Sequence, residues 1–302
     1  MPVRALSYVG IETTDVDRWV AFADEVLGMP SARDEQDGRS RALVRMDQRV
    51  YRFDIRQGSA ERLAWLGWEV SSAAELAETA DQLRAGGTEV APGDPAEARS
   101  RRIKEFVVAH DPAGNRLELF YGQESDFGPF RLTRPMAGYL TGDLGMGHAV
   151  IGVADLEANL RFYTDVLGFR VSDLFKEKMA FLHCNPRHHS LALVQSDSPG
   201  LRHIMLEVEN LDDVGMTLDI GIDRGVVTRR LGRHTNDEAV SFYLETPGGW
   251  EIEFGWAGFQ VDDSNWSVRQ IAGATSLWGH QPVDGRESFA TIGRNVASGA
   301  RG

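Results

Sequence analysis

Apolar and polar residues follow the same order in the two halves of the chain. The segment LSYVGIETTDVDRWVAFADEVLGM, which starts at Leu6, matches MGHAVIGVADLEANLRFYTDVLGF, which starts at Met146, 140 residues later. Each copy has an apolar stretch typical of a strand, an Asp suited to cap a helix, an amphipathic helical stretch, and a Gly where the helix ends. The pattern therefore predicts a duplicated strand–helix unit.

Two further pairs of segments extend the repeat. LAWLGWEVSSAAELAETADQL, from Leu63, matches LRHIMLEVENLDDVGMTLD, from Leu201, and again indicates a strand followed by a helix. HDPAGNRLELFYG, from His110, resembles LETPGGWEIEFGW, from Leu244, where a turn containing Pro and Gly precedes a strand. We therefore predict an α+β fold of four βαβββ modules, two in each domain.

Changes in composition suggest where the domains end. The stretch 128–142 is rich in Gly and Pro, which is typical of a linker. We expect an N-terminal domain at 1–130, a C-terminal domain at 143–285 and a flexible tail at 286–302, where Gly, Ser and Ala predominate. The segment 260–280 is expected to wrap back over the second domain.

Composition also limits the partners and location of the protein. No apolar stretch approaches the roughly 20 residues of a membrane-spanning helix, and the N-terminus turns polar too early for a secretory signal. The net charge of −13 argues against a nucleic-acid partner, because phosphates are bound by excess Lys and Arg. The one basic cluster, Arg99 to Lys104, is expected to be a solvated turn or strand edge. Cys184 is the only cysteine, and we expect it to be buried in a cytoplasmic protein.

The repeat provides an internal control for the histidines, six of which lie between 148 and 234. At matched positions the two copies carry different residues: Tyr8, Trp65 and Glu118 in the first, and His148, His203 and Glu253 in the second. Features that both copies share must serve the fold. Histidines present in only one copy are not required by that fold, and they are candidates for chemistry.

Two imidazoles and one carboxylate indicate a metal site. The strands that carry His148 and His203 start equivalent modules and should lie side by side, while the closing strand supplies the carboxylate. Such a ligand set leaves positions open for substrate and oxygen, and it suits Fe(II) enzymes. Glu251 competes with Glu253, because alternate residues of a strand share a face. Setting Pro112 on Pro247 aligns Glu253 with the carboxylate of the first copy and so favours it.

At this point the sequence resembles a known family. The segments GMGHAVIGVADLEANLRFYTDVLGF, LHCNPRHHSLAL, HIMLEVENLDDVG, LGRHTND, SFYLETPGGWEIEFGW and SLWGH are similar to those of type I extradiol catechol dioxygenases of the vicinal oxygen chelate superfamily. The likeness covers nearly the whole chain. It is greatest to family members that act on bicyclic or polycyclic catechols, namely 2,3-dihydroxybiphenyl and catecholic steroids.

The resemblance implies a role for each of several residues. His148, His203 and Glu253 match the family's iron ligands, and His189 matches its acid–base histidine, whose ordinary pKa suits proton transfer near neutral pH. Two more residues match groups that donate hydrogen bonds to the substrate oxygens: His234 and Tyr243.

Other residues near the motifs are less specific. Asn236 and Asp237 match substrate-binding positions but equally suit a turn. His188 is expected to point to the other side of the strand and to be structural, and His183 is expected to be a strand residue. The segment from Val171 to His183 is short and suggests a tight loop over the cleft.

The family also implies the reaction and the cofactor. We expect extradiol cleavage of a 2,3-dihydroxybiphenyl-like catechol with Fe(II) and O2, giving a 2-hydroxy-6-oxo-dienoate; Mn(II) is the alternative metal. A dioxygenase for a catecholic steroid is the alternative function. Further alternatives are a metal-dependent isomerase or thiol transferase and a non-catalytic aromatic-binding protein of the same superfamily. Family members form homo-oligomers, often octamers.

Overall fold

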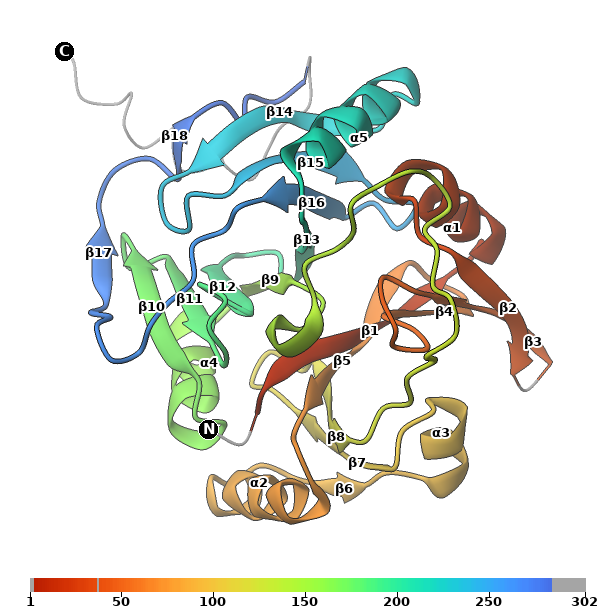
Figure 1. The fold of residues 1–302 in the computed structure, drawn as a ribbon. Helices are drawn as coiled ribbons and strands as arrows, with labels where there is room; N and C mark the ends of the chain where they lie inside the picture. Colours follow the sequence, from red (N-terminus) through yellow and green to blue (C-terminus); the bar gives the residue numbers. More distant parts are fainter. Residues whose placement is uncertain (1–2, 37, 284–302) are drawn as a thin grey trace.

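The computed structural model describes residues 3–36 and 38–283, and its first half consists of two βαβββ modules (Figure 1). The first module contains β1 (Ala5–Thr13), α1 (Val16–Phe22), the π-helical turn η1 (Ala23–Leu27), β2 (Ser31–Gln36), β3 (Arg39–Val44) and β4 (Phe53–Gln57). The second contains β5 (Arg62–Glu69), α2 (Ala73–Ala85), β6 (Ala91–Pro92), α3 (Pro95–Ser100), β7 (Glu105–His110) and β8 (Arg116–Tyr121). The short helix α3 is an addition to the predicted pattern.

The second half repeats this plan. After the short 3-10 helix η2 (Gly142–Leu144), the third module contains β9 (His148–Val153), α4 (Leu156–Arg161), η3 (Phe162–Val166), β10 (Arg170–Phe175), β11 (Met179–His183) and β12 (Leu191–Gln195). The fourth contains β13 (Gly200–Val208), α5 (Leu211–Asp223), β14 (Val227–His234), β15 (Val240–Glu245) and β16 (Glu251–Trp256). Two short strands follow, β17 (Arg269–Ile271) and β18 (Ser276–Trp278). The predicted α+β fold of four βαβββ modules is confirmed.

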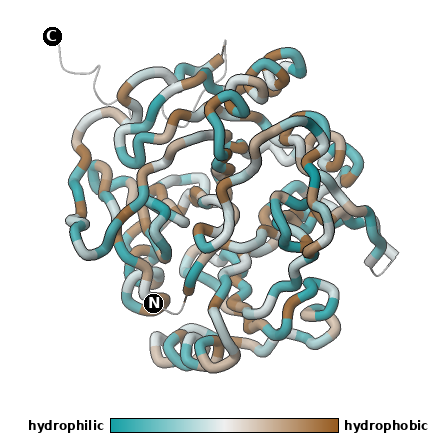
Figure 2. The backbone as a smooth tube through the Cα atoms, viewed as in Figure 1, coloured by the Kyte–Doolittle hydropathy of each residue, from teal (hydrophilic) through white to brown (hydrophobic). Residues whose placement is uncertain are grey.

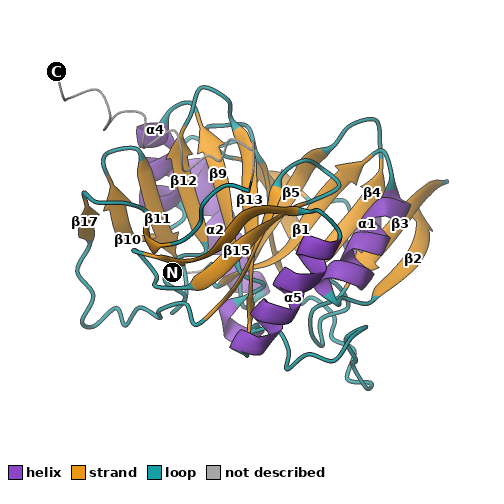
Figure 3. Ribbon diagram, turned by 90° about the horizontal axis from the view of Figure 1, so that it is seen from above, coloured by secondary structure: helices purple, strands orange, loops and turns teal. Residues whose placement is uncertain are grey.

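Each half forms one mixed sheet. The strand order is β2-β3-β4-β1-β5-β8-β7-β6 in the first and β17-β10-β11-β12-β9-β13-β16-β15-β14-β18 in the second. In both sheets, the first strands of the paired modules are antiparallel neighbours at the centre. The helices cover the outside of the sheets, and α5 of the second half packs against η1 of the first, beside α1 (Figure 3).

The repeated helix signals act as the sequence predicts. The side chains of Asp15 and Asp155 accept hydrogen bonds from backbone N–H groups in the first turns of α1 and α4. Gly28 and Gly168 follow the helices with φ of 74° and 75°, a conformation that favours glycine. The shared Asp and Gly therefore set the start and end of equivalent helices.

Buried apolar residues from both halves form one continuous core. Across the junction, the rings of Trp68 and Phe169 meet edge to face at 5.0 Å, and those of Trp19 and Trp250 lie 5.3 Å apart. Hydrophobic and hydrophilic residues are interspersed along the backbone (Figure 2), and the central strands β1 and β9 are buried almost throughout. The two sheets therefore support each other, although the predicted domain limits remain predictions.

Several local predictions can be compared with the structure. The segment 260–280 does return to the second sheet, where β17 pairs with β10 and β18 with β14. Cys184 is buried, as expected. Among the described residues, no helix is long and apolar enough to cross a membrane. The predicted tail at 286–302 lies outside the described residues.

Other local predictions were wrong. The segment between Val171 and His183 is a β-hairpin of β10 and β11, not a loop, because Lys176 and Glu177 adopt positive φ and close a tight turn. In the basic cluster at 99–104, Arg99, Arg102 and Lys104 are exposed, as expected, but Arg101 is buried and pairs with an internal carboxylate.

Candidate metal centre and active site

Strand register brings the three predicted ligands together. On β13, Met205 lies opposite His148 of the antiparallel strand β9 and level with Glu253 of the parallel strand β16. His203 lies two residues before Met205, so the two side chains share a face of the sheet. The predicted arrangement of neighbouring starting strands and a carboxylate from the closing strand is therefore observed.

The ligand atoms lie close enough to share one ion. The Nε2 atoms of His148 and His203 are 3.4 Å apart, and Oε2 of Glu253 lies 3.5 Å from the former and 3.1 Å from the latter. Ligands about 2.1 Å from one ion and at right angles would be about 3 Å apart. Among the described residues, these three are the group of His, Cys, Asp and Glu side chains that could hold a metal.

The charge states also suit a cation. Burial lowers the pKa of His148 to about 4, against the opposing effect of Glu253, so this imidazole is neutral near pH 7. Burial would raise the pKa of Glu253, but His234, His148 and His203 hold it well below its usual value. Metal ligands must be neutral imidazoles and ionised carboxylates. The residues present therefore fit a divalent metal ion.

The second oxygen of Glu253 is held in place by its neighbours. Oε1 accepts a hydrogen bond from Oγ of Ser241 at 2.6 Å and lies 3.0 Å from Nε2 of His234. Ser241 in turn contacts His280, whose ring stacks on His234 at 4.2 Å. These contacts leave Oε2 directed toward His148 and His203. Ser241 was not predicted from the sequence, because its contact with Glu253 depends on cross-strand register.

His189 lies beside the ligand cluster. Its ring stacks on that of His148 with centroids 3.8 Å apart, and Phe181 packs edge-on against it at 5.0 Å. Burial, reinforced by His148 and His188, holds the pKa of His189 well below its usual value. A neutral imidazole next to a metal centre can accept a proton.

His234 and Tyr243 form a polar pair on the other side of Glu253. Nε2 of His234 lies 2.8 Å from the Tyr243 hydroxyl, and its Nδ1 is 3.1 Å from the carbonyl of Thr275. Burial disfavours the charged form of His234, yet Glu253 and Asp237 raise its pKa to about 9. The Tyr243 ring packs under the guanidinium of Arg229 at 4.2 Å. This pair therefore places polar hydrogens beside the carboxylate.

Of the remaining candidate residues, Asp237 and Asn236 lie near His189, and Glu251 points away from the ligand cluster. Asp237 is buried, with Oδ2 3.9 Å from Nδ1 of His189 and Oδ1 accepting from the backbone of Ala239. Asn236 is buried in the same turn, and its carbonyl accepts a hydrogen bond from Arg269. Glu251 is held away from the cluster by hydrogen bonds to Thr228 and Arg229.

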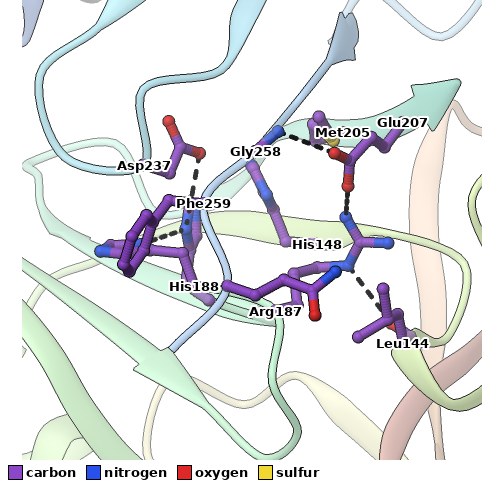
Figure 4. A pocket seen from close by; sticks show the side chains of 11 residues that line it. Leu144, His148, Arg187, His188, Met205, Glu207, Asp237, Gly258 and Phe259 are labelled. Carbon is purple, nitrogen blue, oxygen red and sulfur yellow. Dashed lines mark hydrogen bonds and ion pairs between the residues drawn. The ribbon is translucent and has the colours of Figure 1, made fainter. Parts of the chain in front are cut away.

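A small cavity lies beside this cluster, and all of its lining residues belong to the second half of the chain (Figure 4). His148, His189 and Asp237 line it on the side of the metal centre. On the opposite side lies a buried ion pair between Arg187 and Glu207, and Glu207 also accepts from the backbone N–H of Gly258. The cavity therefore lies against both His148 and His189.

The first copy of the fold has a different arrangement at the matched positions. Tyr8 lies opposite Gly67, and Gly67 is level with Glu118, which repeats the register of the second copy. Glu118 accepts hydrogen bonds from the hydroxyl of Tyr8 at 2.8 Å and from Nε of Arg101 at 2.7 Å. Glu118 therefore has a structural hydrogen bond and a buried salt bridge. A guanidinium supplies the cation in this copy.

The prediction that His188 points to the other side of a strand was wrong. His188 and His189 lie in the irregular segment between β11 and β12, so strand alternation does not apply, and their Nδ1 atoms are 3.0 Å apart. The other nitrogen of His188 contacts Asp173. His183 ends strand β11, as expected, and contacts Ser172 and Asp263.

Comparisons with known proteins agree with this geometry. Residues 145–254 match the family model described as the glyoxalase/bleomycin resistance protein/dioxygenase superfamily, and residues 6–58 match the model described as dihydroxybiphenyl dioxygenase BphC D1. A biphenyl-2,3-diol 1,2-dioxygenase of Metapseudomonas furukawaii is 42% identical, covering 96% of this chain and 98% of the relative.

Two further relatives cover almost the whole chain. An iron-dependent extradiol dioxygenase of Rhodococcus jostii (strain RHA1) is 41% identical over 93% of this chain and 97% of its own length. The crystal structure of a halotolerant catechol dioxygenase superposes with a TM-score of 0.88 at 34% identity, covering 93% of this chain and 95% of that one. The similarity therefore extends over both sheets.

Proposed function

This chain belongs to the extradiol catechol dioxygenases of the glyoxalase/bleomycin resistance protein/dioxygenase superfamily, and from this premise we propose that it opens the ring of a biphenyl-type catechol. The cofactor is Fe(II), the co-substrate is O2, and the product is a 2-hydroxy-6-oxo-dienoate. The observation that carries the proposal is the cluster of His148, His203 and Glu253 with His189 stacked against it. A non-catalytic binding protein would not need this set of ligands.

His148, His203 and Glu253 would hold the metal. When bound, Fe(II) supplies the open coordination positions and the redox chemistry through which a catechol and O2 react. Ser241 keeps one carboxylate oxygen of Glu253 occupied, so the other is available to the ion. A catechol must lose a hydroxyl proton as it chelates, and this chain has to provide the group that receives it.

His189 is the proposed proton acceptor. Its imidazole is buried and neutral, and it lies against a ligand ring, where a chelating catechol would also lie. It accepts a proton from one catechol hydroxyl and returns a proton later in the reaction. Asp237, 3.9 Å from Nδ1 of His189, orients this ring, and Asn236 and Asp237 together shape the substrate side of the site.

His234 and Tyr243 are proposed to stabilise negative charge. Both side chains are largely buried, and each carries a polar hydrogen beside the carboxylate of Glu253. Donors fixed in a dry site stabilise charge that develops during a reaction, because they need not reorganise. Their hydrogen bonds therefore favour substrate oxygens that become more negative.

The substrate class follows from the relatives. The biphenyl-2,3-diol 1,2-dioxygenase of Metapseudomonas furukawaii is 42% identical to this chain over nearly the full length. A two-ring catechol is therefore the first choice, and a catecholic steroid is the second. The family also leads us to expect a cytoplasmic homo-oligomer, such as an octamer. Light scattering of the iron-loaded protein would give its mass relative to the 33.4 kDa chain.

The experiment is anaerobic loading with Fe(II), followed by a panel of catechols in air-saturated buffer. The panel contains 2,3-dihydroxybiphenyl, 3-methylcatechol, catechol and a catecholic steroid, and the readout is the yellow ring-opened product. We expect kcat/KM to be highest for 2,3-dihydroxybiphenyl, by about tenfold over catechol, since burying a second ring adds favourable contacts. A higher value for the steroid would favour the alternative substrate, and absence of product from every catechol despite bound iron would refute the reaction.

Loading with Mn(II) tests the metal assignment. Samples loaded to equal occupancy with Fe(II) or with Mn(II) are assayed with the same catechol. The proposal expects Fe(II) to give the higher kcat. A higher kcat with Mn(II) would contradict it.

A further inference from the structure

Three buried side chains form a linear hydrogen-bonded series behind the metal centre. Nδ1 of His189 lies 3.0 Å from Nδ1 of His188, and Nε2 of His188 lies 3.0 Å from Oδ2 of Asp173. All three side chains are buried. We infer that Asp173 and His188 are positioning residues that determine which ring nitrogen of His189 carries its proton. This inference rests on the proposed function, in which His189 receives the catechol proton.

The direction of each hydrogen bond follows from the chemistry of the groups. Burial would raise the pKa of Asp173, but His188 and Arg269 lower it, so the carboxylate is ionised and can only accept. Nε2 of His188 must therefore donate to it. In a neutral imidazole the other nitrogen is then an acceptor, so Nδ1 of His188 accepts and Nδ1 of His189 donates. Nε2 of His189 is left as the nitrogen that can accept a proton.

If Nδ1 of His188 donated to Nδ1 of His189 instead of accepting from it, His188 would have to be cationic. That ring could then donate from both nitrogens and reverse the tautomer of His189. However, the guanidinium of Arg269 already balances Asp173 through two hydrogen bonds of 2.8 and 2.6 Å and lies 3.4 Å from Nε2 of His188. A second cation in this buried place would be repelled by Arg269. The hydrogen-bond directions given above place no second cation beside Arg269.

The series depends on an element that follows the repeated modules. Arg269 lies on β17, directly beside Asp173 of β10 in the parallel register. Its guanidinium also stacks on the ring of Trp266 at 4.6 Å, and the indole N–H donates to the carbonyl of Ser172. Arg269 therefore holds Asp173 next to His188, since the two side chains contact the same carboxylate oxygen, Oδ2. The segment after the last module thus completes the support of His189.

The first copy indicates that the fold does not need this series. Backbone hydrogen bonds link Ser190 to Leu182 and to Ala149, and the same pattern links Arg52 to Val44 and to Val9. Ser190 and Arg52 are therefore equivalent, so Val50 and Tyr51 stand where His188 and His189 do. An apolar Val is compatible with the fold at the place of His188. Its replacement by a His that contacts the neighbouring ring points to a role in chemistry.

Loss of the contact between Asp173 and His188 should act as it does in other His–carboxylate pairs, in which the carboxylate determines which ring nitrogen is protonated. Replacing the carboxylate of such a pair by an amide can preserve geometry and still remove most activity, because the wrong nitrogen is then protonated. Asp173→Asn presents an N–H to either His188 or Arg269, which disfavours the required direction of the bonds. His188→Gln keeps a donor near Asp173 but removes the acceptor at the Nδ1 position.

The experiment compares variants of the full-length protein loaded with Fe(II). We expect His188→Gln and Asp173→Asn to lower kcat about 10- to 100-fold, within the range for acid–base catalysis, while KM for the catechol stays within about twofold. His188→Asn, whose amide oxygen can take the acceptor position of Nδ1, should recover most of the loss. Iron content per chain is measured for each variant.

His183→Gln is the matched control. His183 is also a buried histidine that contacts an aspartate, Asp263, at 2.9 Å, but its contacts are with Ser172 and Asp263 rather than His189. Its substitution should leave kcat within about twofold. The inference is overturned if His188→Gln, at equal iron content, lowers kcat no more than His183→Gln, or if the Asn and Gln variants of His188 are equally impaired.

A spectroscopic test does not depend on turnover or on the folding of variants. The full-length wild-type chain is labelled with ¹⁵N-histidine and loaded with diamagnetic Zn²⁺, which the same ligands can bind. The inference predicts that Nδ1 of His189 is protonated and that Nε2 is not. Protonation of Nε2 alone would overturn it. Failure of the iron-loaded protein to cleave any catechol would instead refute the proposed function and leave this tautomer measurement intact.

Discussion

Glu118 and Glu253 stand at the same register position in the two sheets but have different surroundings. Glu253 lies on the strand next to the one that carries His203, and Glu118 lies on the strand next to the one that carries the matched residue, Trp65. Glu118 meets the guanidinium of Arg101 and the hydroxyl of Tyr8. Glu253 meets the imidazoles of His148 and His203. One copy therefore supplies its own cation, and the other presents a ligand set for a metal ion.

Matched substitutions of these two residues should have opposite effects. Glu253→Gln weakens metal binding because a neutral amide replaces an anionic ligand, so iron content per chain should fall at least tenfold after dialysis. Glu118→Gln leaves buried Arg101 without its anion, and we expect it to keep iron but lose about 3 kcal/mol of unfolding free energy. Metal analysis and urea unfolding distinguish them. Equal iron loss in both variants would contradict the ligand assignment.

Substitution of His189 should separate metal binding from turnover. His189→Gln removes the proposed proton acceptor but leaves all three ligands, so iron content should be unchanged and kcat should fall about 10²- to 10⁴-fold. Tyr51→Phe is the control, because Tyr51 occupies the equivalent place in the first copy. It should leave kcat within about twofold. A kcat for His189→Gln close to that of the wild type would exclude the acid–base role.

Removal of the Tyr243 hydroxyl tests the proposed stabilisation of charge. Tyr243→Phe eliminates the 2.8 Å contact with His234 while the ring keeps its packing under Arg229. We expect kcat to fall at least tenfold, since loss of one preorganised donor can cost about 10²- to 10³-fold. Tyr8→Phe should instead keep kcat and lose about 1 kcal/mol of stability. If both variants lose only stability, Tyr243 has no part in the reaction.

The buried carboxylate of Asp54 should make stability depend on pH. Burial would raise its pKa, but Arg56 and Arg41 hold the pKa below the ordinary value of 3.8. Because the folded-state pKa is lower than the unfolded one, ionised Asp54 stabilises the fold above about pH 4. This contribution is lost as the pH falls through the folded-state pKa.

Urea unfolding of metal-free protein at pH 6 and pH 3 measures this contribution. Asp54→Asn should show a smaller loss of unfolding free energy between the two pH values than the wild type, by at most about 1.3 kcal/mol, because pH 3 lies only about one unit below the unfolded-state pKa. Asp24→Asn, at an exposed carboxylate, is the control. Equal pH dependence in the wild type and Asp54→Asn would show that Asp54 contributes nothing.

The modules could be predicted because their signals are local. Asp155 caps a helix a few residues away, and Gly168 ends it, so a short window of sequence contains the cause. The neighbouring positions of His148, His203 and Glu253 could also be predicted, because the duplicated pattern fixes the order of strands. The predicted catalytic and metal-binding roles remain for experiment to test.

The environment of His189 could not be predicted in this way. His188 lies in an irregular segment, where alternation gives no direction for the side chain, and its partner Asp173 is held by Arg269 from a strand outside the repeat. Arg101 presents the same difficulty. A cluster of basic residues appears solvent-exposed from sequence, and only tertiary contact with Glu118 explains the burial of one member.

The most direct measurement of the central claim is the mass and quantity of product formed from 2,3-dihydroxybiphenyl by the iron-loaded protein under ¹⁸O2. The account predicts one O2 consumed for each catechol, and a yellow ring-opened product whose mass equals that of the catechol plus one O2, with ¹⁸O incorporated. A quinone without added oxygen, a product cleaved between the two hydroxyl-bearing carbons, or unchanged catechol with full iron occupancy would contradict it.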